Sequence, residues 1–157
     1  MRNKFFAFAA FFVFAAGFSG CASLTGKDDA SVEFDKESSA EDVRVRETKT
    51  RTNLSQLETA VADYVKTEHK VPEKLDNLVP KYLPDIPSVE AAPCGGDSNR
   101  VQSYPADILR DGQVDGSRIN GSGRWGYVYN DARVVIFVDC LKPSITGVPW
   151  YQVRGIY

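Results

Sequence analysis

Apolar residues follow different patterns in different parts of the chain. Residues 5–18 are almost wholly Phe, Ala and Val and carry no charge, whereas residues 22–53 are mainly polar. From residue 54 onward apolar side chains recur at helical spacing, and from residue 125 they form runs rich in Val, Ile and aromatic residues. The pattern therefore predicts an apolar leader, a polar stretch, an amphipathic helix and a group of strands.

The helix is predicted to begin near Ser38, because Ser38 and Glu41 have the spacing of a capping box. Residues 41–53 are polar on all sides, so this part is expected to be solvated or frayed. The second half carries apolar residues at steps of 3, 4, 3 and 1, which place them on one helical face: Leu54, Leu57, Val61, Tyr64 and Val65. Pro72 ends the helix, because helical geometry is disfavoured for the residue before a proline.

The C-terminal third predicts strands. The runs WGYVYN and RVVIFVDCL flank a turn at 130–132, and VPWYQVRGIY offers a third strand. Residues 72–87 predict a helix of two turns and then an extended segment, while residues 91–122, rich in Gly, Asp, Ser and Asn, predict loops with at most short strands. The expected fold class is α+β, with an N-terminal helix packed on a small antiparallel sheet of three to four strands.

The apolar leader has the parts of an export signal. Arg2 and Lys4 precede an apolar run of about 14 residues, which is shorter than the roughly 20 residues that span a bilayer. The run closes on Phe18-Ser19-Gly20-Cys21, which resembles the lipobox of bacterial lipoproteins. The resemblance implies cleavage after residue 20 and several acyl chains on Cys21, enough for stable anchoring to a membrane. The alternative is an ordinary secretory signal that has a cysteine near its end.

The resemblance to a lipoprotein signal also indicates how the chain is divided and where the protein is located. Residues 1–20 are the signal peptide, residues 21–37 a lipidated flexible tether, and residues 38–157 the folded domain. The tether is expected because its polar composition cannot bury enough surface to offset ordering. Ala22, in place of the Asp that retains lipoproteins in the inner membrane, favours the outer membrane, facing the periplasm or the cell surface.

Net charge and cysteine content narrow the kinds of partner and bound group that the chain can have. The chain has 19 Lys and Arg against 21 Asp and Glu, and the signal peptide holds two of the cations and none of the anions, so 17 cations face 21 anions in the mature chain. This acidic balance argues against a nucleic-acid partner. With Cys21 lipidated, Cys94 and Cys140 remain, and a disulfide between them is the expected state in an oxidising compartment. The alternative, a zinc site, would need more ligands than His69 supplies.

The order of elements in residues 40–157 resembles type IV pilin-like proteins, and most closely the major pseudopilin of type II secretion. The resemblance is carried by LETAVADYVKTEHKVP, then EKLDNLVPKYLPDIP, then GRWGYVYNDARVVIFV. Its individual positions are Leu57, Ala60, Tyr64, Pro72, Leu75, Leu78, Tyr82, Leu83, Pro87, Trp125 and Tyr127. It implies a pilin-like domain, for which a disulfide from the loop region to the sheet would be suitable. The hydrophobic helix that forms a pilus core is missing after Cys21, so the chain is not expected to polymerise as a pilus subunit.

No residue pattern supports catalysis. The acidic segment 111–116 lacks the Glu of a calcium loop, because the twelfth position is Ser122. His69, Asp131 and Asp139 have no partner defined by spacing, so helix-terminal, turn and surface roles are expected for them. We therefore expect no enzyme activity, cofactor or bound metal.

Four aromatic residues form a candidate interface: Trp125, Tyr127, Tyr129 and Trp150. The alternative, which we prefer, is that alternate members of this aromatic set fill the core beneath the helix. With period-two alternation both can hold, because Trp125, Tyr127 and Tyr129 share one face. The expected function is a lipid-anchored, non-enzymatic envelope protein in secretion, pilus assembly or surface attachment, with secretion or pilus components as partners. The alternative function is a periplasmic ligand-binding or hydrolytic domain that uses the 91–122 loops.

Overall fold

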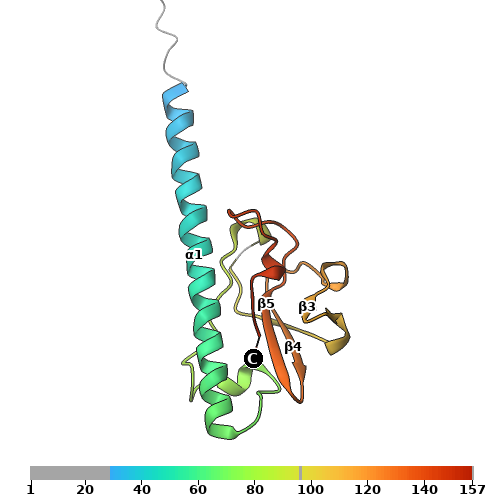
Figure 1. Cartoon of the computed structure of the whole chain (residues 1–157). Helices are drawn as coiled ribbons and strands as arrows, with labels where there is room; N and C mark the ends of the chain where they lie inside the picture. Colours follow the sequence, from blue (N-terminus) through green and yellow to red (C-terminus); the bar gives the residue numbers. More distant parts are fainter. Residues whose placement is uncertain (1–28, 96, 157) are drawn as a thin grey trace, which may run out of the picture.

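The computed structural model describes residues 29–95 and 97–156 (Figure 1). The long helix α1 (Asp29–Glu68) lies along a small sheet, and its first turns project beyond the rest of the protein. The expected α+β arrangement is therefore confirmed. The predicted signal peptide, the first part of the predicted tether and Cys21 lie outside the described residues. Within the described part, no helix is both long and apolar enough to cross a membrane.

Helix α1 begins earlier than the capping box at Ser38 predicted. It starts at Asp29, so residues 29–37 of the predicted flexible tether are helical. This segment contains Ala, Glu and Lys and has neither Gly nor Pro, so a helix that is already nucleated by packing can extend through it. At its other end α1 stops at Glu68, and His69 takes the left-handed conformation, with φ of 56°, that commonly ends helices.

The apolar face of α1 packs as predicted. Leu54, Leu57 and Val61 are buried against the sheet, and Tyr64 and Val65 are half-buried at the edge of the same cluster. The expectation that residues 41–53 are solvated is wrong for their inner face, because Glu47, Thr50 and Asn53 are buried as well. These polar side chains continue the same stripe toward the N-terminus, and each has a hydrogen-bond partner outside the helix.

The main sheet has the strand order β1-β4-β5-β6. Its members are β1 (Val101–Tyr104), β4 (Trp125–Asn130), β5 (Arg133–Val138) and β6 (Arg154–Ile156). Strands β4, β5 and β6 form the predicted antiparallel part. Strand β1 pairs with β4 in parallel, so the sheet is mixed and the fully antiparallel expectation is wrong at this edge. The connection through residues 105–124 is long enough for the crossover that a parallel pair requires.

The remaining elements are short. A two-stranded sheet is formed by β2 (Leu109–Arg110) and β3 (Gln113–Val114), which confirms the expectation of at most short strands in 91–122. The 3₁₀ helices are η1 (Leu75–Leu78), η2 (Ala92–Cys94), η3 (Ala106–Ile108), η4 (Gly116–Arg118) and η5 (Trp150–Gln152). Helix η1 is shorter than the predicted two turns because Pro80 follows closely.

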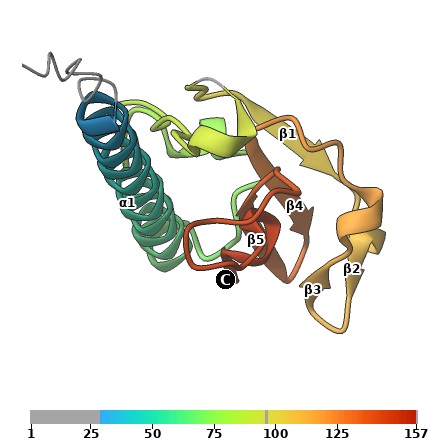
Figure 2. The same ribbon diagram turned by 90° about the horizontal axis from the view of Figure 1, so that it is seen from above.

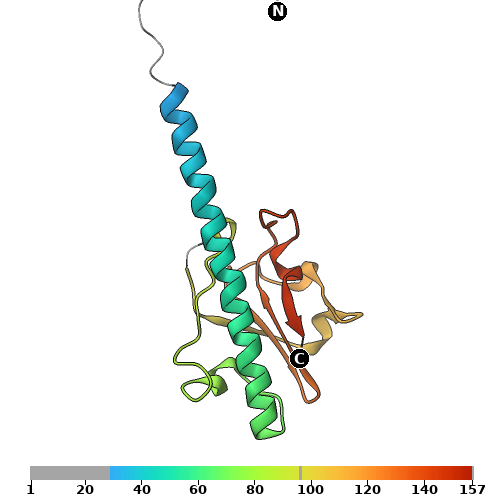
Figure 3. The same ribbon diagram turned by 60° about the vertical axis from the view of Figure 1, so that its left-hand side comes forward.

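Both faces of the sheet are covered. One face of β4 and β5 packs against α1, which runs along the sheet in Figure 3. The other face packs under the segment that contains β2 and β3, on the side away from α1 (Figure 2). On this second face the ring of Phe137 lies directly over Gly126, where an added Cβ would be 2.2 Å from the Phe137 Cζ. The sheet is therefore the central layer between the helix and the short strands.

Candidate functional site

Residues 141–149 form most of the connection between β5 and η5, and we call them the apolar loop. It lies beside α1 at the end of the body from which the helix projects (Figure 1). Just before the loop, Cys140 forms the predicted disulfide with Cys94, with their Cα atoms 5.7 Å apart. Within the loop the Ser144 amide donates to the Val148 carbonyl at 2.9 Å, and the buried Trp150 follows its end. Both ends of the apolar loop are thus fixed to the core.

A buried carboxylate on α1 holds the middle of the apolar loop. Glu47 is 1% exposed, and its two carboxylate oxygens lie 3.1 and 3.0 Å from the Ile145 amide, which donates to them. Hydrogen bonds to a charged acceptor are stronger than neutral ones. Because α1 carries the acceptor and the loop carries the donor, this contact fixes the loop to the helix.

Arg51, one turn further along α1, makes a second contact with the apolar loop. Its Nη2 donates to the Ser144 Oγ at 3.3 Å, and its guanidinium carbon lies 5.1 Å from the ring centroid of Trp150. This is the geometry of a cation–π interaction. Glu47, Arg51 and the disulfide therefore hold the loop in one conformation.

Three aliphatic side chains of this fixed loop are exposed, beside the exposed Lys142 and Thr146. Leu141, Ile145 and Val148 are 52%, 54% and 42% exposed. Beside Ile145 is a surface hollow of about 370 Å³, whose other apolar lining residues are Val43, Ala92, Pro93 and Pro143. All three residues belong to one loop of nine residues, and an exposed apolar patch on a folded protein marks an interaction site. The apolar loop is therefore the candidate site for a partner.

Replacing Glu47 with Gln tests the attachment of the loop. The neutral amide can accept only a weaker hydrogen bond from Ile145, so we expect the free energy of unfolding to fall by about 1–2 kcal/mol. The Ile145 amide should also exchange with solvent faster. Urea denaturation and hydrogen exchange measure the two effects. The matched control is Glu41→Gln, because Glu41 is exposed and forms an ion pair with Arg44 on the same helix. Equal changes in both variants would contradict the assigned role of Glu47.

The next two members of the buried polar stripe hold the segment before η2. The Thr50 Oγ1 accepts from the Glu90 amide at 2.8 Å, and the Asn53 Nδ2 donates to the Ser88 carbonyl at 2.7 Å. The Lys49 ammonium lies 2.6 Å from the Glu90 carboxylate, and its hydrogen bond is the main reason that the pKa of Glu90 is lowered. This segment leads into η2 and Cys94, so α1 supports the disulfide and the loop from a second direction.

The four aromatic residues of the predicted interface lie mainly in the core. Trp125, Tyr127 and Trp150 are at most 1% exposed, so they are not available to a partner and the interface prediction is wrong for them. The Trp125 Nε1 donates to the Pro87 carbonyl at 2.6 Å, and the Tyr127 hydroxyl donates to the Pro72 carbonyl. Burial raises the pKa of Tyr127. Tyr129 is half-buried, and its hydroxyl donates to Asp131 at 3.0 Å.

The acidic residues singled out in the sequence have structural partners. Asp115 accepts from the Ser117 amide at 3.0 Å, and Arg110 lies 3.1 Å from its other oxygen. Among the described residues, no group of three or more His, Cys, Asp or Glu side chains is placed to hold a metal ion.

The other two carboxylates do not form a pair. Asp139 is fully buried and accepts from the amides of Gly121 and Ser122 at 2.9 and 3.0 Å. Asp131 lies at the far end of β5, in the hairpin turn, so the strand separates the two carboxylates by roughly 20 Å. They are therefore too far apart for paired-carboxylate chemistry.

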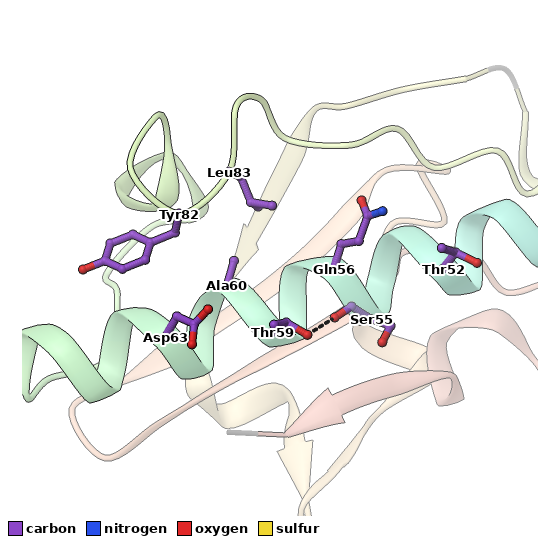
Figure 4. Close-up of a pocket in the computed structure, with 8 residues that line it drawn as sticks. All are labelled: Thr52, Ser55, Gln56, Thr59, Ala60, Asp63, Tyr82 and Leu83. Atoms are coloured by element: carbon purple, nitrogen blue, oxygen red, sulfur yellow. Dashed lines mark hydrogen bonds between the residues drawn. The ribbon is translucent and has the colours of Figure 1, made fainter.

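A shallow groove runs along the outer side of α1 (Figure 4). Thr52, Ser55 and Thr59 line it on the helix, and Tyr82 and Leu83 lie on its other side. The Thr59 hydroxyl donates to the Ser55 carbonyl at 3.0 Å, so it is engaged within its own helix. The lining also includes the carboxylate of Asp63, and neither histidine nor cysteine is among the lining residues.

The sequence analysis did not indicate the residues of the candidate site, because they lie where one pattern of apolar and polar residues ends and the next begins. Glu47 and Thr50 continue the spacing of Leu54 and Leu57 by further steps of 3 and 4, and this spacing was the available signal. Leu141 and Val148 were included in the predicted strands at 133–141 and 148–157, which is wrong because β5 ends at Val138 and β6 begins only at Arg154. The structure places both residues, with Ile145, in the loop between β5 and η5.

Comparison of the chain with known protein families, with characterised proteins and with solved structures finds no match. A functional assignment therefore depends on the geometry described above.

Proposed function

We propose that the chain is a lipid-anchored, non-enzymatic, pilin- or pseudopilin-like envelope protein that binds a component of a secretion or pilus system through the apolar loop. The observation that carries the proposal is the exposure of Leu141, Ile145 and Val148 on a loop that Glu47, Arg51 and the disulfide hold in place. A rigid apolar surface loses little conformational entropy when it binds, which favours affinity.

The position of the loop supports a partner near the anchoring membrane. The loop lies at the end of the body from which α1 projects toward the N-terminus (Figure 1). If Cys21 carries lipid, this end is the one nearer to the membrane. We infer an outer-membrane location from Ala22, and we infer that α1 replaces the filament-forming helix of pilins with a polar connection to the lipid.

Co-isolation tests the proposal. The native chain, after mild crosslinking in cells, is expected to enrich secretion or pilus components, and Ile145→Asn is expected to reduce this enrichment roughly tenfold, as for an interface anchor residue. Val45→Asn is the matched control, because Val45 is a similarly exposed aliphatic residue, 57% exposed, on α1 outside the loop. Absence of enrichment with the native chain, or equal losses with the two variants, would count against the proposal.

A further inference from the structure

A second concave surface lies between η1 and the beginning of the sheet, and four charged side chains line it. We call it the charged hollow. Its volume is about 640 Å³, and its lining includes Asp76, Asp85, Arg100 and Arg124, with Val79 and Ile86 among its apolar residues. This volume lies within the range of small-molecule sites.

The two arginines are neighbours because of the parallel pairing of β1 with β4. Val101 lies opposite Trp125, so Arg100 and Arg124 immediately precede paired positions, and the Trp125 amide donates to the Arg100 carbonyl at 3.1 Å. Adjacent strands are about 4.8 Å apart, which brings two guanidinium groups to the same end of the sheet. Both side chains line the charged hollow.

The charged side chains of the hollow are not neutralised by ion pairs in the described part of the chain. Arg100 is exposed and Arg124 is half-buried, and neither guanidinium has a carboxylate within ion-pair distance. Asp76 and Asp85 line the same hollow and are also without ion pairs among the described residues. The hollow therefore holds separated positive and negative groups that do not neutralise one another directly.

We propose that the charged hollow binds a small zwitterion, with its carboxylate or phosphate between Arg100 and Arg124 and its ammonium group near Asp76 and Asp85. Paired guanidinium groups match the geometry of carboxylate and phosphate oxygens, and carboxylates accept hydrogen bonds from an ammonium group. Val79 and Ile86 provide apolar contact for a short aliphatic stem. This site is separate from the apolar loop and does not depend on the docking function.

Calorimetric titration of the full chain in detergent tests the proposal. The probes are alanyl-alanine, which carries a carboxylate and an ammonium group, and phosphoethanolamine, which carries a phosphate in place of the carboxylate. Acetate, inorganic phosphate and ethylamine are the probes with one sign of charge. At least one zwitterion is expected to bind ten or more times more tightly than acetate, inorganic phosphate or ethylamine. Which zwitterion binds more tightly distinguishes an amino-acid or peptide end from a phospholipid headgroup. Equal affinity for a zwitterion and for the matching anion would overturn the proposal, as would no binding of either zwitterion.

Substitutions locate the binding. Arg100→Gln and Arg124→Gln are each expected to weaken zwitterion binding at least tenfold without lowering the melting temperature, because neither side chain makes an ion pair among the described residues. Asp85→Asn should weaken zwitterion binding and leave the weak binding of the anions unchanged. Arg133→Gln is the matched control, since Arg133 is a half-buried arginine at the hairpin without an ion pair among the described residues. An effect of Arg133→Gln equal to that of the hollow variants would contradict the assigned location.

Discussion

Replacing both Cys94 and Cys140 with Ala should lower the free energy of unfolding by about 4 kcal/mol, as chain entropy predicts for a disulfide that closes a loop of this length. The two residues are 46 positions apart and join η2 to the end of β5. Without the crosslink the unfolded chain gains freedom, and the apolar loop loses its attachment at Cys140. Urea denaturation of the variant and of the oxidised native protein measures the difference.

The reduced native protein is the control for this experiment. It should be destabilised to a similar extent as the double variant, because both lack the crosslink but only the variant lacks the sulfur atoms. A loss below about 1 kcal/mol in both would show that the disulfide contributes little, against the loop-closure argument.

Replacing Cys21 with Ala should move the protein from the membrane fraction to the soluble fraction. Cys21 is the residue expected to carry the acyl chains, and these chains are the expected anchor. Growth with a fatty-acid analogue, followed by fractionation, measures both labelling and location. The native chain should be labelled and membrane-bound, whereas the variant should be neither.

The variant that lacks Cys94 and Cys140 is the matched control for lipidation. It loses two cysteines but keeps Cys21, so it should still take the label. Lipid anchoring would be contradicted if the native chain took no label and the Cys21→Ala protein stayed equally membrane-bound.

Local patterns predicted the parts of the fold that local chemistry determines. The spacing of Leu54, Leu57 and Val61 gave the buried face of α1, and the two β-rich runs around residues 130–132 gave the β4–β5 hairpin. The pairing of Cys94 with Cys140 followed once Cys21 was assigned to lipid.

Features that depend on distant partners could not be predicted in this way. Glu47 and Thr50 are polar residues that would be costly to bury alone, and only the Ile145 and Glu90 amides make their burial favourable. Strand β1 has four residues and no clear alternation of buried and exposed positions, and a long connection separates it from β4. Its parallel pairing with β4 therefore could not be predicted from the local sequence. The candidate site depends on the first of these features, the contact of Glu47 with the apolar loop, whereas the sequence placed the candidate interface at four aromatic residues, three of which are buried.

Site-specific photocrosslinking in cells tests the docking role of the apolar loop most directly. A photoreactive amino acid replaces Ile145 in one protein and Val45 in another, since both positions are exposed and aliphatic. The account predicts a discrete adduct with an envelope protein from position 145 and none from position 45. The absence of an adduct at position 145, or the same adducts from both positions, would contradict it.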